Sequence, residues 1–134
     1  MRVVKLTLED FPTMAILDDY FEELSSPTGN GRVDVNGDCM GDSQIFAGEI
    51  VVFLHGGRLV KIARASSSVI SPDNGLPPHF TIDIESIHAP RRMLRISEFQ
   101  EILFKVAGLA TNLASKNWNH LQDSDVLISI IDRL

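Results

Sequence analysis

The sequence lacks the features that define several common classes of protein. It has 134 residues and a single cysteine, Cys39, so no disulfide can form within the chain and a cysteine-based zinc site has too few ligands. No apolar run approaches the roughly 20 residues that a membrane span needs, and residues 1–12 carry no long apolar segment of the secretory type. We therefore expect one cytoplasmic domain with no membrane partner.

Positive charge is scarce as well. Lys and Arg together number 12 against 18 Asp and Glu, and the net charge of −6 arises within residues 1–46. An acidic chain binds phosphate backbones poorly, so a nucleic-acid role needs a local basic surface. The same cations would also suit solvated strand ends and helix flanks. The candidates are Arg58, Lys61, Arg64, Arg91, Arg92 and Arg95.

The sharpest local motif resembles a calcium loop. In DVNGD, residues 34–38, the side chains of Asp34, Asn36 and Asp38 have the spacing of the first three ligands. Cys39 stands where the loop needs glycine, and Ile45 stands where it needs the bidentate glutamate. We predict an Asx-rich turn here and no tight calcium site.

Motifs for catalysis and for other metals are missing. The run Ser66–Ser68 has no G-x-S-x-G elbow, and no phosphate loop of the GxxxxGK[ST] type occurs. We predict neither a metal ion nor a cofactor, and we favour a binding protein, with a small enzyme built on residues 25–48 left open. The four histidines form no HxH, HxxxH or HExxH pattern; they are His55, His79, His88 and His120.

Apolar patterning predicts an α+β fold. The run IVVFL has no polar alternation and indicates a strand buried on both faces, which Gly56-Gly57 connects to its antiparallel return strand. Because strands and helices do not alternate regularly, we expect a small curved mixed sheet or partial barrel of about five strands with peripheral helices. The expected strands are 3–8, 32–35, 50–54, 58–70 and 79–87. The expected helices are 10–24, with Asp10 as its cap; 97–109, which opens at Ser97; and a last helix that is capped by Asp123 or Ser124, reaches residue 131 and has Val126 facing inward.

The stretch AGEIVVFLHGGRLVKIARASS, residues 47–67, resembles the central hairpin of the PUA-like superfamily, in particular its EVE, ASCH and YTH-type members. FTIDIESI followed by RRMLRISEFQEIL is similar to the next strand and helix of that family, and LQDSDVLISIIDRL is similar to its closing segment. The resemblance covers about residues 45–134. The N-terminal part differs, because TGNGRVDVNGD stands where EVE-type domains have Trp-x-Gly-Val-Arg-Asn.

The resemblance implies a single PUA-like domain over residues 1–134, alone or as the N-terminal module of a larger protein. Such domains bind nucleic acid, often by holding an extruded modified base, and several are specificity domains of modification-dependent restriction enzymes. We therefore expect nucleic acid as the partner, DNA more than RNA, with a fused or partner nuclease domain. The expected base contacts are Asp34, Asn36, Asp38, Ser43, Phe46, Phe53 and Trp118, and the expected phosphate contacts are Arg58, Arg64, Arg91, Arg92 and Arg95.

Two alternatives stay open at this point. Trp118 can stack on a base, or it can fill the bottom of a small core with its N–H satisfied by the backbone. The whole domain can instead be a protein-interaction or regulatory module, whose helix 10–24 docks a basic partner through its acidic side chains. Those side chains are Asp18, Asp19, Glu22 and Glu23.

Overall fold

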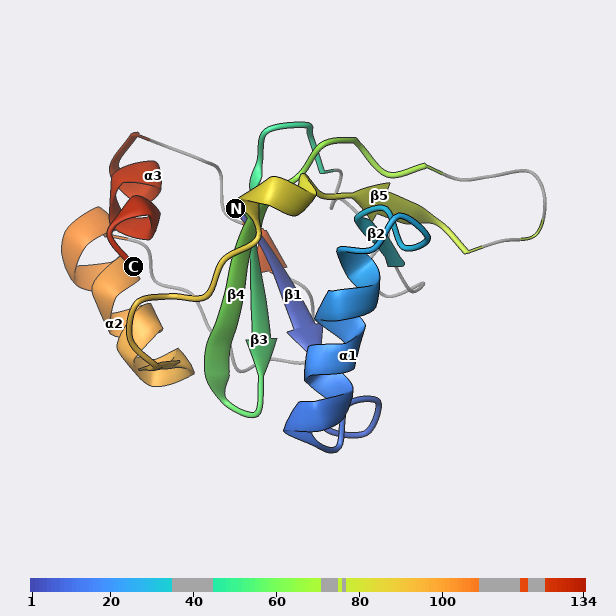
Figure 1. The fold of residues 1–134 in the computed structure, drawn as a ribbon. Coiled ribbons are helices and arrows are strands. Elements are labelled where there is room, and N and C mark those ends of the chain that lie inside the picture. The colour runs from blue at the N-terminus through green and yellow to red at the C-terminus, as the bar shows by residue number, and fades with distance from the viewer. Residues whose placement is uncertain (35–44, 71–74, 76, 109–118, 121–124) are drawn as a thin grey trace.

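The computed structural model of the chain describes residues 1–34, 45–70, 75, 77–108, 119–120 and 125–134 (Figure 1). These residues form an α+β fold, as the apolar pattern predicts. In chain order the elements are β1 (Arg2–Leu6), α1 (Met14–Leu24), β2 (Arg32–Asp34), β3 (Ile50–His55), β4 (Arg58–Arg64), β5 (His79–Thr81), the 3-10 helix η2 (Ile84–Ser86), β6 (Leu94–Arg95), α2 (Ile96–Ala107), β7 (Asn119–His120) and α3 (Asp125–Asp132).

The larger sheet is mixed and has the strand order β6-β4-β3-β1-β7. Its central strand, β3, runs parallel to β1, and every other neighbouring pair in it is antiparallel. Strands β2 and β5 form a second, antiparallel pair. The predicted mixed sheet is therefore confirmed, but the described strands leave it open and do not close it into a barrel.

The sheet has a hydrophobic core on each face, because strand side chains alternate between the two sides. Val51 and Phe53 of β3 pack toward α1 and the β2–β5 pair, whereas Ile50 and Val52 pack toward α2 and α3. All six residues of β3 are buried. The expectation that IVVFL is buried on both sides is confirmed, and Figure 1 shows α1 on one side of β1, β3 and β4 and the helices α2 and α3 on the other.

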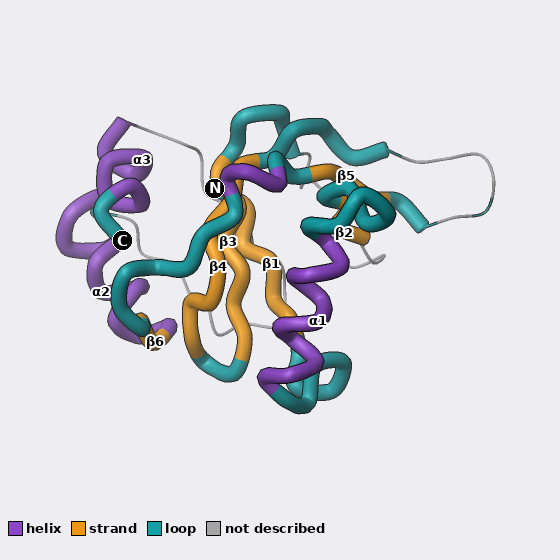
Figure 2. Tube along the Cα trace, viewed as in Figure 1, coloured by secondary structure: helices purple, strands orange, loops and turns teal. Residues whose placement is uncertain are grey.

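The tip of the β3–β4 hairpin is the predicted two-residue turn (Figure 2). Gly56 and Gly57 both have left-handed backbones, with φ of 57° and 76°. This pair of positive φ angles matches the strand twist, and only glycine adopts it without steric cost. The glycine pair therefore encodes the position of the turn and the pairing of His55 with Arg58 and of Leu54 with Leu59, beyond which the register shifts between Phe53 and Leu54.

Two element boundaries differ from the prediction at the N-terminal side of helices. Helix α1 begins at Met14 instead of Asp10, because the side chain of Thr13 accepts the backbone N–H of Ile16 at 3.2 Å and caps the first turn. Helix α2 begins at Ile96, one residue before the predicted Ser97.

The predicted strand 79–87 is also shorter in the structure. Strand β5 ends at Thr81, and the side chain of Asp83 accepts the backbone N–H of Glu85 at 3.1 Å, which caps the 3-10 helix η2. This local bond competes with a strand ladder, and it overrides the apolar alternation through Ile84. In α3, Val126 is 47% exposed and does not face inward as predicted.

Within the described residues, no helix combines the length and the apolarity that crossing a membrane requires.

Candidate functional site

A cavity of about 380 Å³, called the polar pocket here, opens beside β1, α1 and β2. Its wall combines ionic side chains with two aromatic rings, which is the mixture typical of a small-ligand site. Of the predicted base-contacting residues that the structure describes, Asp34 alone lines it. The described residues of its wall are Val4, Lys5, Leu6, Asp10, Phe11, Tyr20, Arg32, Val33, Asp34 and Pro77.

The aromatic side of the polar pocket is anchored in the core by a chain of ring contacts. Tyr20 packs edge-on against Phe11, with ring centroids 5.0 Å apart, and against Phe21 at 5.2 Å. Phe21 in turn packs edge-on against the fully buried Phe53 at 5.2 Å. Edge-to-face pairs favour one relative orientation of their rings, so the pocket wall is held in place from within.

The electrostatics of the polar pocket favour hydrogen bonding at neutral pH. Burial, together with the smaller effect of the negative charge of Asp34, raises the pKa of the Tyr20 hydroxyl to about 12. Tyr20 therefore keeps its proton as a donor. Burial lowers the pKa of the Lys5 amine. At the rim, the Arg32 Nε–H donates to Asp34 Oδ1 at 2.8 Å, which orients the carboxylate.

A second cavity of about 300 Å³, called the apolar pocket here, lies at the tip of the β3–β4 hairpin. His55 on its wall is 7% exposed, and its Nε2 lies 2.7 Å from the carbonyl oxygen of Phe11. Because a carbonyl only accepts, the ring proton sits on Nε2. The hydrogen bond from His55 to Phe11 thus joins the wall of the apolar pocket to the wall of the polar pocket. The described residues that line the apolar pocket are Met14, His55, Gly56, Arg58, Leu59, Val60, Ala89, Pro90 and Met93.

The predicted phosphate-binding arginines fall into two groups. Arg58 and Arg95 are direct neighbours across the β4–β6 pair, and both are exposed. Arg91 and Arg92 are also exposed and lie in the same segment as Met93 of the apolar pocket, where Arg92 Nη1 is 3.8 Å from Glu98 Oε2. We call these four residues the arginine cluster; they are Arg58, Arg91, Arg92 and Arg95.

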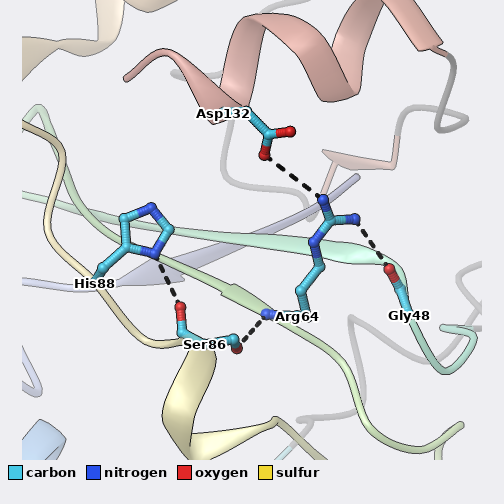
Figure 3. Close-up of polar contacts among 5 residues, drawn as sticks. All are labelled: Gly48, Arg64, Ser86, His88 and Asp132. Carbon is cyan, nitrogen blue, oxygen red and sulfur yellow. Dashed lines mark hydrogen bonds and ion pairs between the residues drawn. The ribbon is translucent and has the colours of Figure 1, made fainter.

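Arg64 is separate from this cluster, at the far end of β4 (Figure 3). Its guanidinium donates to the carbonyl oxygen of Gly48 at 3.2 Å and lies 3.8 Å from the carboxylate of Asp132 on α3. The guanidinium therefore joins β4 to the start of β3 and to α3. The contacts with Gly48 and Asp132 give Arg64 a structural role that the sequence did not indicate.

Ser86 and His88 lie close to Arg64, yet they do not form a catalytic relay (Figure 3). The Ser86 hydroxyl donates to the Asp83 carbonyl at 2.6 Å and accepts the backbone N–H of Arg64 at 2.8 Å. The Nδ1 atom of His88 is 2.9 Å from the Ser86 carbonyl oxygen, not from its hydroxyl. A nucleophile needs its hydroxyl paired with the base, so this trio lacks the required geometry.

Two predicted base-contacting phenylalanines have opposite environments. Phe46 is 62% exposed, and its backbone N–H donates to the Glu49 carboxylate at 3.0 Å. Phe53 has no exposed surface. A side chain without exposed surface cannot stack on a base, so Phe53 is a core residue and its expected role is corrected. Four of the predicted contacts lie outside the described residues, namely Asn36, Asp38, Ser43 and Trp118.

Sequence reasoning missed most of the residues that form the polar pocket. Lys5 offered a signal, because it is the only charge within the apolar strand pattern of residues 3–8. Tyr20 offered none, since its helical spacing fits a core-edge position equally well.

Of the calcium-like turn, Asp34 is paired with Arg32, and Ile45 is buried in the core. Among the described residues, no three His, Cys, Asp or Glu side chains gather closely enough to hold a metal ion.

Comparison of the chain with known protein families, with curated proteins and with solved structures found no match. The functional argument therefore depends on the geometry of the two pockets and of the arginine cluster.

Proposed function

We propose that this protein is a PUA-like nucleic-acid-binding module that holds one base in the polar pocket. The observation that carries the proposal is the composition of that pocket. Its aromatic wall offers ring surface to a planar base, while Asp34 offers a carboxylate acceptor and Tyr20 a hydroxyl donor. Base-binding pockets use this combination of stacking and edge hydrogen bonds.

Affinity would come from the arginine cluster. Arg58 is the cross-strand partner of His55, whose ring is hydrogen-bonded to the carbonyl oxygen of Phe11 in the polar pocket. A strand of nucleic acid could therefore reach from the cluster to the polar pocket. Phosphate contacts supply affinity that does not depend on sequence, and the pocket supplies selectivity. This division explains how a chain with a net charge of −6 could still bind DNA locally.

The finer proposal concerns the biological setting. A module that reads a modified base in the cytoplasm suits the specificity domain of a modification-dependent restriction nuclease, with the catalytic domain fused to it or bound as a partner. This proposal depends on the resemblance of residues 45–134 to PUA-like domains, together with the polar pocket.

Fluorescence anisotropy with labelled DNA tests the proposal. Wild-type protein is titrated with single-stranded and duplex oligonucleotides that contain cytosine, 5-methylcytosine, adenine or N6-methyladenine, at several salt concentrations. Arg58→Ala and Arg95→Ala should each weaken binding to every sequence and flatten the dependence of affinity on salt by roughly one counterion. Arg64→Ala is the matched control, because Arg64 is held by Gly48 and Asp132 away from the cluster, and it should leave the salt dependence unchanged.

Absence of any nucleic-acid binding at low salt, where the electrostatic attraction is strongest, would overturn the proposal.

A second candidate function, binding of a basic protein partner, would then take its place. The acidic side chains of α1 are all exposed, and α1 contains no basic residue, so this helix suits a basic protein partner. Those side chains are Asp18, Asp19, Glu22 and Glu23.

A further inference from the structure

The apolar pocket has a composition that nucleic-acid binding does not require. Its wall is formed mainly by aliphatic carbon from Leu59, Val60, Ala89 and Pro90, together with two methionines. A phosphate backbone gains nothing from such a wall, because its charged oxygens favour donors and cations. The recess is large enough for one bulky aliphatic or aromatic side chain.

Exposed apolar side chains extend the apolar pocket, also called the recess below, across the surface. Met14 is 57% exposed and Met93 is 63% exposed, and both line the pocket. Leu8 is 61% exposed and lies beside the hairpin turn, since a Cβ placed on Gly56 would meet its Cδ2 atom at 3.9 Å. Contiguous exposed apolar groups with a polar rim mark binding surfaces, and methionine adapts well to a partner's shape.

The charge around the recess defines what kind of partner fits. Arg58 lines the apolar pocket itself, and Arg95 is its cross-strand neighbour. Arg91 and Arg92 precede Met93 in the sequence. Among the described residues, Glu98 forms an ion pair with this cluster, through Arg92. An apolar recess with a cationic rim complements a segment that is apolar at one position and acidic around it.

We propose that the apolar pocket docks an acidic protein segment, which inserts one bulky apolar side chain between Met14 and Met93 while its carboxylates face the arginine cluster. The apolar anchor supplies affinity within the recess, and the charges guide the approach and fix the orientation. The segment uses the same cations that nucleic acid would use, so the two partners compete. This inference is independent of the proposed base pocket, because it uses none of the polar pocket's residues.

A peptide titration tests the proposal. The probe is a fluorescein-labelled synthetic peptide of glutamate and leucine residues, with a glutamate–serine peptide and a lysine–leucine peptide of equal length as controls. Only the glutamate–leucine peptide should bind wild-type protein appreciably. Met93→Glu places a repelling charge on the recess and should weaken that binding about tenfold or more. Met14→Glu gives the same test at the second methionine that lines the apolar pocket.

The matched control is Phe104→Glu, since Phe104 is 61% exposed on α2 and lines neither pocket. It should leave peptide affinity unchanged. Equal binding of the glutamate–serine peptide would overturn the proposal, because charge alone would then explain the contact. Equal effects of Met93→Glu and Phe104→Glu would overturn it too. Loss of DNA binding but not of peptide binding in Met93→Glu would assign the recess to nucleic acid instead.

Discussion

Two pockets of similar volume have walls that meet at Phe11 and His55, and the side chains that line the two pockets differ in chemistry. The polar pocket, about 380 Å³, is lined by charged and aromatic side chains, whereas the apolar pocket, about 300 Å³, is lined mainly by aliphatic ones. The His55 Nε2–H donates to the Phe11 carbonyl oxygen at 2.7 Å, and the rings of these two residues pack edge-on with centroids 6.5 Å apart, so the two walls are in contact. A small domain can thus present a selective site and a tolerant site within one region of its surface.

The difference between the pockets lies in how their walls are held. In the polar pocket, the edge-on contacts of Tyr20 and the bond from Arg32 to Asp34 orient the groups that would contact a ligand. In the apolar pocket, Met14 and Met93 are more than half exposed and unbranched, so they can adjust to a partner. Fixed polar groups discriminate between ligands, while adaptable apolar groups accept a range of anchors.

The largest expected effect comes from removing the core support of the polar pocket. Phe53→Ala deletes a ring that is fully buried against Phe21 and should lower the free energy of unfolding by about 3–5 kcal/mol. Urea unfolding followed by circular dichroism measures this loss. Phe46→Ala is the control, since Phe46 is 62% exposed and its removal should change stability by less than about 0.5 kcal/mol. A Phe53→Ala protein as stable as wild type would contradict the assignment of Phe53 to the core.

The next effect concerns the ionisation of the Tyr20 hydroxyl in the polar pocket. The folded protein holds the Tyr20 proton up to a pKa of about 12, whereas the hydroxyl of the unfolded chain ionises near 10. The contribution of the neutral Tyr20 hydroxyl to the free energy of unfolding is therefore fully present below pH 10, and it is lost as the pH rises from 10 through 12. Its size is of order 2 kcal/mol.

Tyr20 is the only tyrosine, so phenolate absorbance during a pH titration reports it alone. We expect a midpoint near 12, which Asp34→Asn should lower without returning it to 10, because burial is the larger cause. A wild-type midpoint near 10 would show that the hydroxyl is solvated, and the polar pocket would then lack its neutral donor.

A smaller effect is expected at the rim of the polar pocket. Asp34→Ala removes the carboxylate that would accept hydrogen bonds from a base edge, and it should reduce the preference between modified and unmodified oligonucleotides by about 1–3 kcal/mol. Weak binding to all sequences should remain. Asp19→Ala removes the same charge from an exposed position on α1 outside the pocket, and it should leave the preference intact. A matching loss in both variants would point to net charge instead of base contact.

The parts of the fold that the sequence predicts well are those with local causes. The glycine pair encodes the hairpin turn, and the unbroken apolar run encodes the double burial of β3. Residues 79–87 were misread because the short bond from Asp83 to Glu85 carries no apolar signal and yet ends the strand pattern.

The candidate site was harder to predict, because long-range pairing assembles it. The β4–β6 pair brings Arg58 beside Arg95, and it is not visible in either segment alone. The position of Tyr20 opposite Asp34 likewise depends on how α1 and β2 pack against β1. Positive charge alone named the arginines of the cluster as candidates, and their role stays a prediction. The separate structural role of Arg64 followed only from its contacts with Gly48 and Asp132.

One crossed binding measurement tests most directly whether the two pockets serve different ligands. Base preference in DNA binding and affinity for the glutamate–leucine peptide are measured by anisotropy for wild type, Asp34→Ala and Met93→Glu. The account predicts that Asp34→Ala loses base preference but keeps peptide affinity, and that Met93→Glu weakens peptide binding about tenfold while base preference stays. If either variant lost both, or if wild type bound neither probe at low salt, the assignment of two separate ligands to the two pockets would be contradicted.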